Sequence, residues 1–205
     1  MQPIDVEGML YLIPAMLIGL TFHEFAHAFA AYKLGDPTAK NMGRLTVNPL
    51  KHLDVVGTLF LLVFRFGWAK PVPFNPLHFK GDRQRGILLV SLAGPASNLL
   101  IAIVTAFIWK FTVPQSDIIN RIIGNIFYIN VILAVFNFIP VPPLDGSKIL
   151  AGILPRKYSH IMYNLEKYGF LILILLLVFG IFDLILWPLV DFVRFIISAI
   201  VGIRL

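Results

Sequence analysis

The chain contains no cysteine among its 205 residues. Disulfide bonds and thiolate metal sites are therefore excluded. Any metal ion that this protein holds must be bound by histidine, aspartate or glutamate.

Charged residues are also scarce, at 14% of the chain, whereas hydrophobic residues make up 58%. A typical soluble domain is about a quarter charged and about half apolar. The mean hydropathy of +0.84 points in the same direction. The composition predicts an all-α polytopic membrane protein, folded as a single domain over residues 1–205 and surrounded by the lipid bilayer.

The net charge of +6 does not indicate a nucleic-acid partner. The sequence has no patch of interleaved basic and aromatic residues and no known nucleic-acid-binding motif. Basic residues are instead expected where membrane segments reach the cytoplasm.

The N-terminus lacks the basic segment with which a signal peptide begins, since its first twelve residues contain no lysine or arginine. The first apolar run is therefore expected to be a retained helix. The hydrophobic pattern predicts about five spanning helices, near residues 8–34, 86–109, 118–139, 163–182 and 184–203. The apolar run at 55–64 is too short to span alone, so it is expected to be half-inserted or buried in protein.

The distribution of lysine and arginine predicts the orientation in the cell membrane. Nine of these residues lie between positions 33 and 85, whereas the loop between the second and third spans carries only Lys110 and Arg121. Cytoplasmic loops carry the excess of basic residues. The long loop is therefore expected in the cytoplasm and the N-terminus outside.

The first apolar helix contains the motif "HEFAH", which places His23, Glu24 and His27 in a lipid-compatible stretch. Ionisable side chains at membrane depth are costly and indicate a functional site. His23 and His27 are spaced i, i+4 and lie on one helical face, so both can bind one zinc ion. Glu24 lies beside them, where a carboxylate can take a proton from a water molecule.

A catalytic zinc usually has three protein ligands, so a third is expected from elsewhere in the chain. The candidates are His52, Asp54, His78, Asp145 and His160. The histidines lie in loops with basic neighbours, as surface residues do, and Asp54 fits the N-cap of a helix. Asp145 also fits an N-cap, but it follows a proline-broken stretch, "IPVPPLDG", between two apolar segments. Irregular backbone at membrane depth lines a cavity or is buried in protein, which favours Asp145 as the third ligand.

The combination of "HEFAH" on an apolar helix with a distant "NFIPVPPLDG" resembles the site-2 protease family of intramembrane zinc metalloproteases. The resemblance covers nearly the whole chain and is greatest to short prokaryotic members without a PDZ or CBS module. It implies that His23, His27 and Asp145 bind one zinc ion and that Glu24 is the catalytic acid and base. The implied reaction is hydrolysis of peptide bonds in or near transmembrane segments, for regulated proteolysis or for clearance of signal peptides.

Two asparagines are further candidates. Ser91, Gly94 and Asn98 fall on one helical stripe of "SLAGPASNLL", a pattern that also suits close helix packing. The family has a similar asparagine beside its active site, and Asn137 matches the one that begins its proline-rich stretch. The resemblance implies that Asn98 and Asn137 hold the substrate or donate to the oxyanion, without separating the two roles.

Cleavage of a transmembrane helix requires unwinding and new partners for the freed backbone. An exposed strand edge supplies such partners by β-augmentation. We expect a re-entrant β-hairpin after the first helix, with substrate pairing along its alternating segment, which comprises Arg44, Leu45, Thr46, Val47 and Asn48. The alternative is an ordinary cytoplasmic hairpin.

Other functions remain open at this level. A zinc transporter or zinc-binding membrane protein would use the same ligands, although transporters often carry repeated metal-binding segments and this chain has one cluster. A catalytically idle binding protein and a zinc hydrolase of lipids are further alternatives. The expected protein partners are transmembrane substrates, together with a second copy or a regulatory membrane protein.

Overall fold

The computed structural model describes residues 6–58, 68–112 and 116–203. Long helices dominate these residues, and short 3-10 turns connect some of them. In chain order the helices are α1 (Val6–Lys33), α2 (Thr38–Asn41), α4 (Arg83–Thr112), α5 (Asp117–Phe138), α6 (Asp145–Ile153), α7 (Ser159–Val178) and α8 (Ile181–Val201). The 3-10 turns are η1 (Pro49–Lys51), η2 (Pro76–His78) and η3 (Arg156–Tyr158).

Four of the described helices are long and apolar enough to cross a membrane: residues 11–33 of α1, all of α4, all of α5 and all of α8. The expected polytopic membrane protein is therefore confirmed, and these helix ends lie within a few residues of the predicted ones. The span expected near 163–182 falls on α7, which is not among the four. The apolar run at 55–64 falls largely on residues 59–67, which lie outside the described part of the chain.

The expected re-entrant β-hairpin is wrong. Over residues 43–58 the chain forms turns, η1 and a helical turn, and pairing in the described residues is limited to one antiparallel bridge between Leu53 and Ala69. Local hydrogen bonds explain the difference, because Asn48 donates to Thr46 Oγ1 and its own side chain accepts from Leu50 N–H. Such side-chain bonds compete with a strand ladder, and Pro49 has no N–H to donate to one.

The pairing role expected for Arg44, Leu45, Thr46, Val47 and Asn48 loses its basis with the hairpin. Arg44 is buried and its guanidinium donates to the carbonyl of Lys70, 2.5 Å away. The carbonyl of Thr46 lies 2.7 Å from Nε2 of His52. These groups therefore hold two loops together instead of forming an open strand edge.

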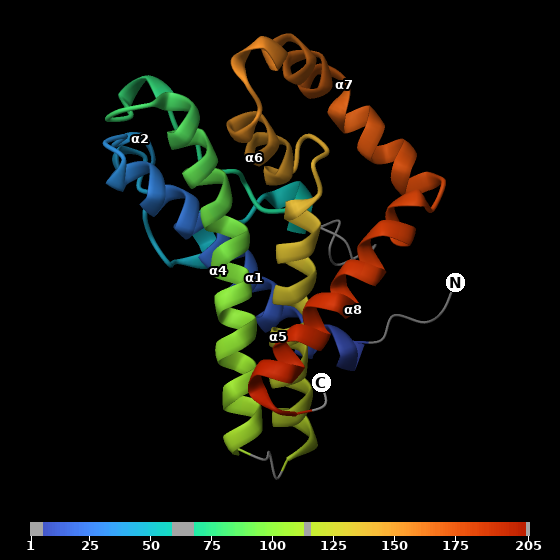
Figure 1. Cartoon of the computed structure of the whole chain (residues 1–205). Helices are drawn as coiled ribbons and strands as arrows, with labels where there is room; N and C mark the ends of the chain where they lie inside the picture. Colours follow the sequence, from blue (N-terminus) through green and yellow to red (C-terminus); the bar gives the residue numbers. More distant parts are fainter. Residues whose placement is uncertain (1–5, 59–67, 113–115, 204–205) are drawn as a thin grey trace.

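Helix α4 lies at the centre of the bundle and packs against α1, α5, α6 and α8. Figure 1 shows α4 and α5 side by side along the long axis, with α6 near the opposite end of α5 from the α4–α5 connection. The largest core cluster is formed mainly by apolar side chains of α4, α5 and α8. This core fixes α4 and α5 as a frame against which α1 and α6 are held.

The stretch between α5 and α6 returns the chain sharply toward the bundle. Prolines at 140, 142 and 143 prevent α5 from continuing, and α6 begins at Asp145. A Cβ on Gly146 would lie 2.3 Å from the carbonyl oxygen of Ile139 and 2.4 Å from that of Phe138. The contact leaves no room for a side chain at position 146, so the glycine lets the first turn of α6 pack directly onto the end of α5.

Candidate metal centre and active site

Two histidines of α1 and one aspartate of α6 meet at a single point. Nε2 of His23 lies 3.0 Å from Nε2 of His27. Oδ2 of Asp145 lies 3.0 Å from each of these nitrogens. Both histidines are buried and Asp145 is partly buried. The fold thus brings together the three residues singled out as ligands, although Asp145 is 118 positions from His27 in the chain.

The outer nitrogens of both imidazoles are held by acceptors on α4. Nδ1 of His27 lies 2.7 Å from the backbone carbonyl of Val90, and Nδ1 of His23 lies 2.7 Å from Oδ1 of Asn98. A carbonyl oxygen only accepts, so in each histidine Nδ1 carries the hydrogen and donates it. In a neutral imidazole the other nitrogen, Nε2, then holds a lone pair.

The donor set fits a zinc ion. Two Nε2 lone pairs and a carboxylate oxygen face one another, with no hydrogen between them in the neutral imidazoles, and a cation relieves their mutual repulsion. Three tetrahedral ligands about 2.0 Å from a common zinc ion would be about 3.3 Å apart, close to the observed 3.0 Å. Each histidine also has the outer hydrogen-bond partner that metal-binding histidines usually have.

Glu24 follows His23 on α1 and lies outside the three-ligand cluster. Its Oε2 accepts a hydrogen bond, 2.8 Å long, from the backbone N–H of Val72. Val72 lies between two prolines in the loop that precedes η2, and its side chain is buried against Ala28 and Ala39. The loop therefore holds the carboxylate beside the cluster.

The remaining ligand candidates lie elsewhere. His52 was expected at the surface but is buried against the carbonyl of Thr46. Asp54 accepts from Gly57 N–H, as an N-cap does. His78 contacts Asp36, and the side chain of His160 lies outside the described ones. Among the described candidates, Asp145 alone joins the two histidines.

Comparison with known proteins identifies the family. The profile of peptidase family M50 matches residues 111–180. The chain is 40% identical over 191 residues to YwhC of Bacillus subtilis, named as a zinc metalloprotease, covering 89% of this chain and 87% of YwhC. This chain belongs to peptidase family M50, the site-2 protease family of intramembrane zinc metalloproteases. Another relative, Rip2 of Mycolicibacterium smegmatis, also named as a zinc metalloprotease, is 32% identical, covering 86% of this chain and 70% of Rip2. No solved structure matches the chain significantly.

The two asparagines predicted at the M50 site have different surroundings. Asn98 is completely buried, and its amide donates to the carbonyl of Gly19 and to Oδ1 of Asn130, both 2.9 Å away. Both N–H bonds of Asn98 are thus used inside the bundle. Asn137 lies in the last turn of α5, where its amide donates to the carbonyl of Leu133, 3.0 Å away.

Two residues of the M50 peptidase escaped the sequence analysis. Asn130 is completely buried in α5 and contacts Asn98. An amide in the middle of an apolar span was the available signal, since it needs a partner. Asp36 is also completely buried, just after α1, and accepts hydrogen bonds from Thr38, Asn75 N–H and His78. Its "LGDP" context suggested only the end of a helix.

Hydrogen bonding also fixes the charge of Asp36, which lies outside the membrane spans. Burial alone would raise the pKa of this carboxyl. The hydrogen bonds from Thr38, Asn75 and His78 outweigh burial and hold the pKa of Asp36 below its usual 3.8. Asp36 is therefore an ionised anchor that ties the end of α1 to the loop carrying Val72 and Asn75.

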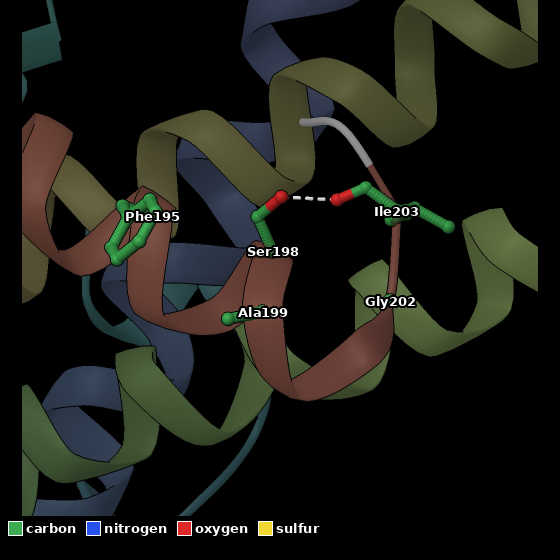
Figure 2. A pocket seen from close by; sticks show the side chains of 5 residues that line it. All are labelled: Phe195, Ser198, Ala199, Gly202 and Ile203. Carbon is green, nitrogen blue, oxygen red and sulfur yellow. Dashed lines mark hydrogen bonds between the residues drawn. The ribbon is translucent and has the colours of Figure 1, made fainter.

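Two surface hollows lie outside this cluster. One, of about 300 Å³, is lined by Phe195, Ser198, Ala199, Gly202 and Ile203 near the end of α8 (Figure 2). There Ser198 Oγ donates to the carbonyl of Ile203. The other, of about 370 Å³, lies where the end of α4 meets the start of α5 and includes Trp109 and Arg194. The lining of neither hollow includes a residue of the histidine–aspartate cluster.

Proposed function

We propose that this M50 protease hydrolyses peptide bonds within or beside transmembrane segments of membrane proteins, using His23, His27 and Asp145 as zinc ligands and Glu24 as general acid and base. The observation that supports these assignments is the convergence of two imidazole nitrogens and a carboxylate oxygen at 3.0 Å from one another. Their position in and beside an apolar helix supports a substrate that is itself in the membrane.

Each residue has a separate task. His23 and His27 present neutral nitrogens, and Asp145 adds the negative charge that favours a divalent cation. When bound, zinc supplies a Lewis acid that polarises the scissile carbonyl and makes the attacking water more acidic. Glu24 accepts the proton from that water and delivers it to the leaving amine. The N–H of Val72 keeps one oxygen of Glu24 directed while the other is left for proton transfer.

The asparagines divide into two roles. Both N–H bonds of Asn98 are already used, so we assign it to holding His23 and not to donating to the oxyanion. Asn137 lies in the turn of α5 that precedes the proline-rich break, and its amide is partly exposed. It remains our candidate for contacting the substrate backbone or the oxyanion.

The active site opens toward the cytoplasm in this proposal, with the N-terminus outside the cell membrane. The excess of lysine and arginine between residues 33 and 85 supports this orientation. Residues 1–205 act as one catalytic domain. Lipid covers the exposed apolar side chains of α7 and α8, and the further protein partner we expect is a second copy or a regulatory membrane protein.

A zinc transporter is the alternative that uses the same ligands. Among the described residues, one such cluster is present, whereas a transport pathway often has several sites. Glu24 separates the two functions, because a hydrolase needs a proton acceptor beside the metal and a transporter does not.

The test is cleavage of single-span membrane peptides by the purified, zinc-loaded protein in bilayers, with products mapped by mass spectrometry. We expect cuts within or beside the apolar segment. Glu24→Gln should abolish cleavage while zinc stays bound at one equivalent. Glu166→Gln, an exposed glutamate of α7, is the matched control and should cleave like the wild type. Zinc that binds and crosses sealed vesicles equally well with and without Glu24, in the absence of any cleavage, would instead establish transport.

A further inference from the structure

Two completely buried amides link three helices behind the metal centre. Asn98 belongs to α4 and Asn130 to α5, and Asn98 also contacts α1 through His23 and Gly19. A buried amide in an apolar setting is costly unless its hydrogen bonds are satisfied. These amides satisfy each other, so the question is what the pair does beyond packing.

The orientation of each amide is determined by a backbone carbonyl, which can only accept. Nδ2 of Asn130 donates to the carbonyl of Ile126, 2.8 Å away, so its Oδ1 faces Asn98. Nδ2 of Asn98 donates to that Oδ1 and to the carbonyl of Gly19, so Oδ1 of Asn98 faces His23. A flipped Asn98 would place its oxygen against two other oxygens.

The chain of donors and acceptors therefore ends on His23. Because Oδ1 of Asn98 accepts, the ring of His23 must carry its hydrogen on Nδ1. A free neutral imidazole side chain prefers to carry its hydrogen on Nε2. The buried amides oppose that preference and leave the Nε2 lone pair pointing at His27 and Asp145.

We propose that Asn130, acting through Asn98, is a positioning residue that sets the tautomer of His23 for zinc binding. The inference rests on the proposed function in taking His23 as a ligand. The hydrogen bonds of the Asn130 side chain go to Asn98 and to the carbonyl of Ile126, so it acts on His23 through Asn98. It acts by keeping Asn98 from turning its N–H bonds toward the histidine.

Substitution of the two asparagines should weaken zinc binding to different extents. Removing an outer partner of a metal-binding histidine typically costs about 10- to 100-fold in metal affinity. Asn98→Leu removes the acceptor itself and should weaken zinc binding by about that factor. Asn130→Leu should weaken it by about three- to tenfold, because Gly19 still accepts from one N–H of Asn98.

The experiment measures zinc affinity by competition with a chromophoric chelator, for the full-length protein in detergent or bilayers. In parallel, ¹⁵N NMR of labelled histidines in the zinc-free protein reports which ring nitrogen of His23 carries the hydrogen. Asn125→Leu is the matched control, since this asparagine also lies on α5 but is directed to the carbonyl of Arg121 near the helix start. Thermal unfolding identifies any variant that fails to fold.

A double-mutant cycle separates positioning from general packing. If Asn130 acts on His23 through Asn98, then Asn130→Leu in the otherwise wild-type protein weakens zinc binding and raises the fraction of His23 that carries its hydrogen on Nε2. In protein that already carries Asn98→Leu, the same substitution causes no further loss of zinc affinity. The proposal would be overturned if Asn130→Leu lowered zinc affinity equally in the wild type and in Asn98→Leu. It would also be overturned if Asn130→Leu changed neither the ¹⁵N signal of the His23 ring nor the zinc affinity. If the wild-type protein bound no zinc, the result would instead overturn the assignment of His23 as a zinc ligand, on which this proposal rests.

Discussion

A Cβ atom added to Gly94 would lie 2.4 Å from Nε2 of His27 and 2.6 Å from Nε2 of His23. Helix α4 therefore approaches the metal centre so closely that its backbone forms one wall of the site. The absence of a side chain at position 94 keeps open the space in front of Nε2 of His23 and Nε2 of His27. A side chain at position 94 would fill the space between α4 and the two histidines.

Gly94→Ala should abolish tight zinc binding. The new methyl group must push both imidazoles away from Asp145, which separates the three ligand atoms. Alanine is favoured over glycine in a helix by about 1 kcal/mol, and this gain offsets the cost of displacing the imidazoles. The zinc-free variant should therefore unfold near the wild-type temperature. Zinc titration and thermal unfolding together check this expectation.

Gly124→Ala is the control for this substitution. A Cβ at position 124 would meet the ring of Trp109 at 3.2 Å, and its three nearest atoms all belong to that ring, so zinc affinity should stay within about twofold of the wild type. Wild-type zinc affinity in Gly94→Ala would show that the ligands do not converge as described.

Asp145→Asn tests the charge of the third ligand. The amide keeps the shape of the carboxylate but removes the negative charge, so the cation loses an oxygen donor that it strongly prefers. We expect zinc affinity to fall by at least about 100-fold and peptide cleavage to be lost. Glu166→Gln removes an exposed carboxylate on α7, outside the four candidate spans, and should leave both unchanged. Full zinc occupancy and activity in Asp145→Asn would assign the third ligand elsewhere.

Val72→Pro tests the hydrogen bond that directs Glu24. Proline removes the N–H that donates to Oε2, whereas Val72→Ala trims the side chain and keeps the N–H. A hydrogen bond to a charged group contributes about 1.5–3 kcal/mol, so kcat should fall about tenfold or more in Val72→Pro. Zinc stoichiometry should not change in either variant. Equal losses of kcat in the two variants would attribute the effect to packing against Ala28 and Ala39.

Local patterns in the sequence picked out the residues that converge at the candidate site. The i, i+4 spacing of His23 and His27 depends only on helix geometry, and the proline-broken stretch before Asp145 marked irregular backbone at membrane depth. Long apolar runs likewise predicted the four described spans to within a few residues. In each case the property is determined by neighbours within a few positions along the chain.

Properties that depend on distant contacts were missed or mistaken. The alternation from Arg44 to Asn48 suggested a strand, but no second strand pairs with it in the described part of the chain, and Asn48 instead caps η1. Asn130 and Asn98 are 32 positions apart, and only the packing of α4 on α5 brings them together. Asp36 resembled an ordinary residue at a helix end, because its partners Asn75 and His78 come from a loop about 40 positions away.

The stability of the protein should depend on pH through Asp36. Its pKa is lower in the folded protein than the usual 3.8, so ionised Asp36 favours the folded state. That contribution is fully present above the unfolded value, and it is lost as the pH falls below about 4 and through the folded pKa. Asp36→Asn removes the ionised form at every pH. The wild type should therefore unfold at a higher temperature than Asp36→Asn at pH 6–7, and the gap should narrow toward pH 3.

Thermal unfolding of the wild type and Asp36→Asn in the same detergent measures this difference in unfolding temperature. Zinc is left out so that release of a bound metal at low pH does not contribute to the difference. Glu166→Gln is the control, because that carboxylate is exposed on α7, outside the four candidate spans, and its variant should unfold near the wild-type temperature at pH 7. If the difference in unfolding temperature between the wild type and Asp36→Asn stayed constant from pH 7 to pH 3, the stabilisation would come from hydrogen bonds that do not require an ionised Asp36. A narrowing gap, together with reduced kcat in Asp36→Asn at pH 7, would tie the ionised anchor to the loop that directs Glu24.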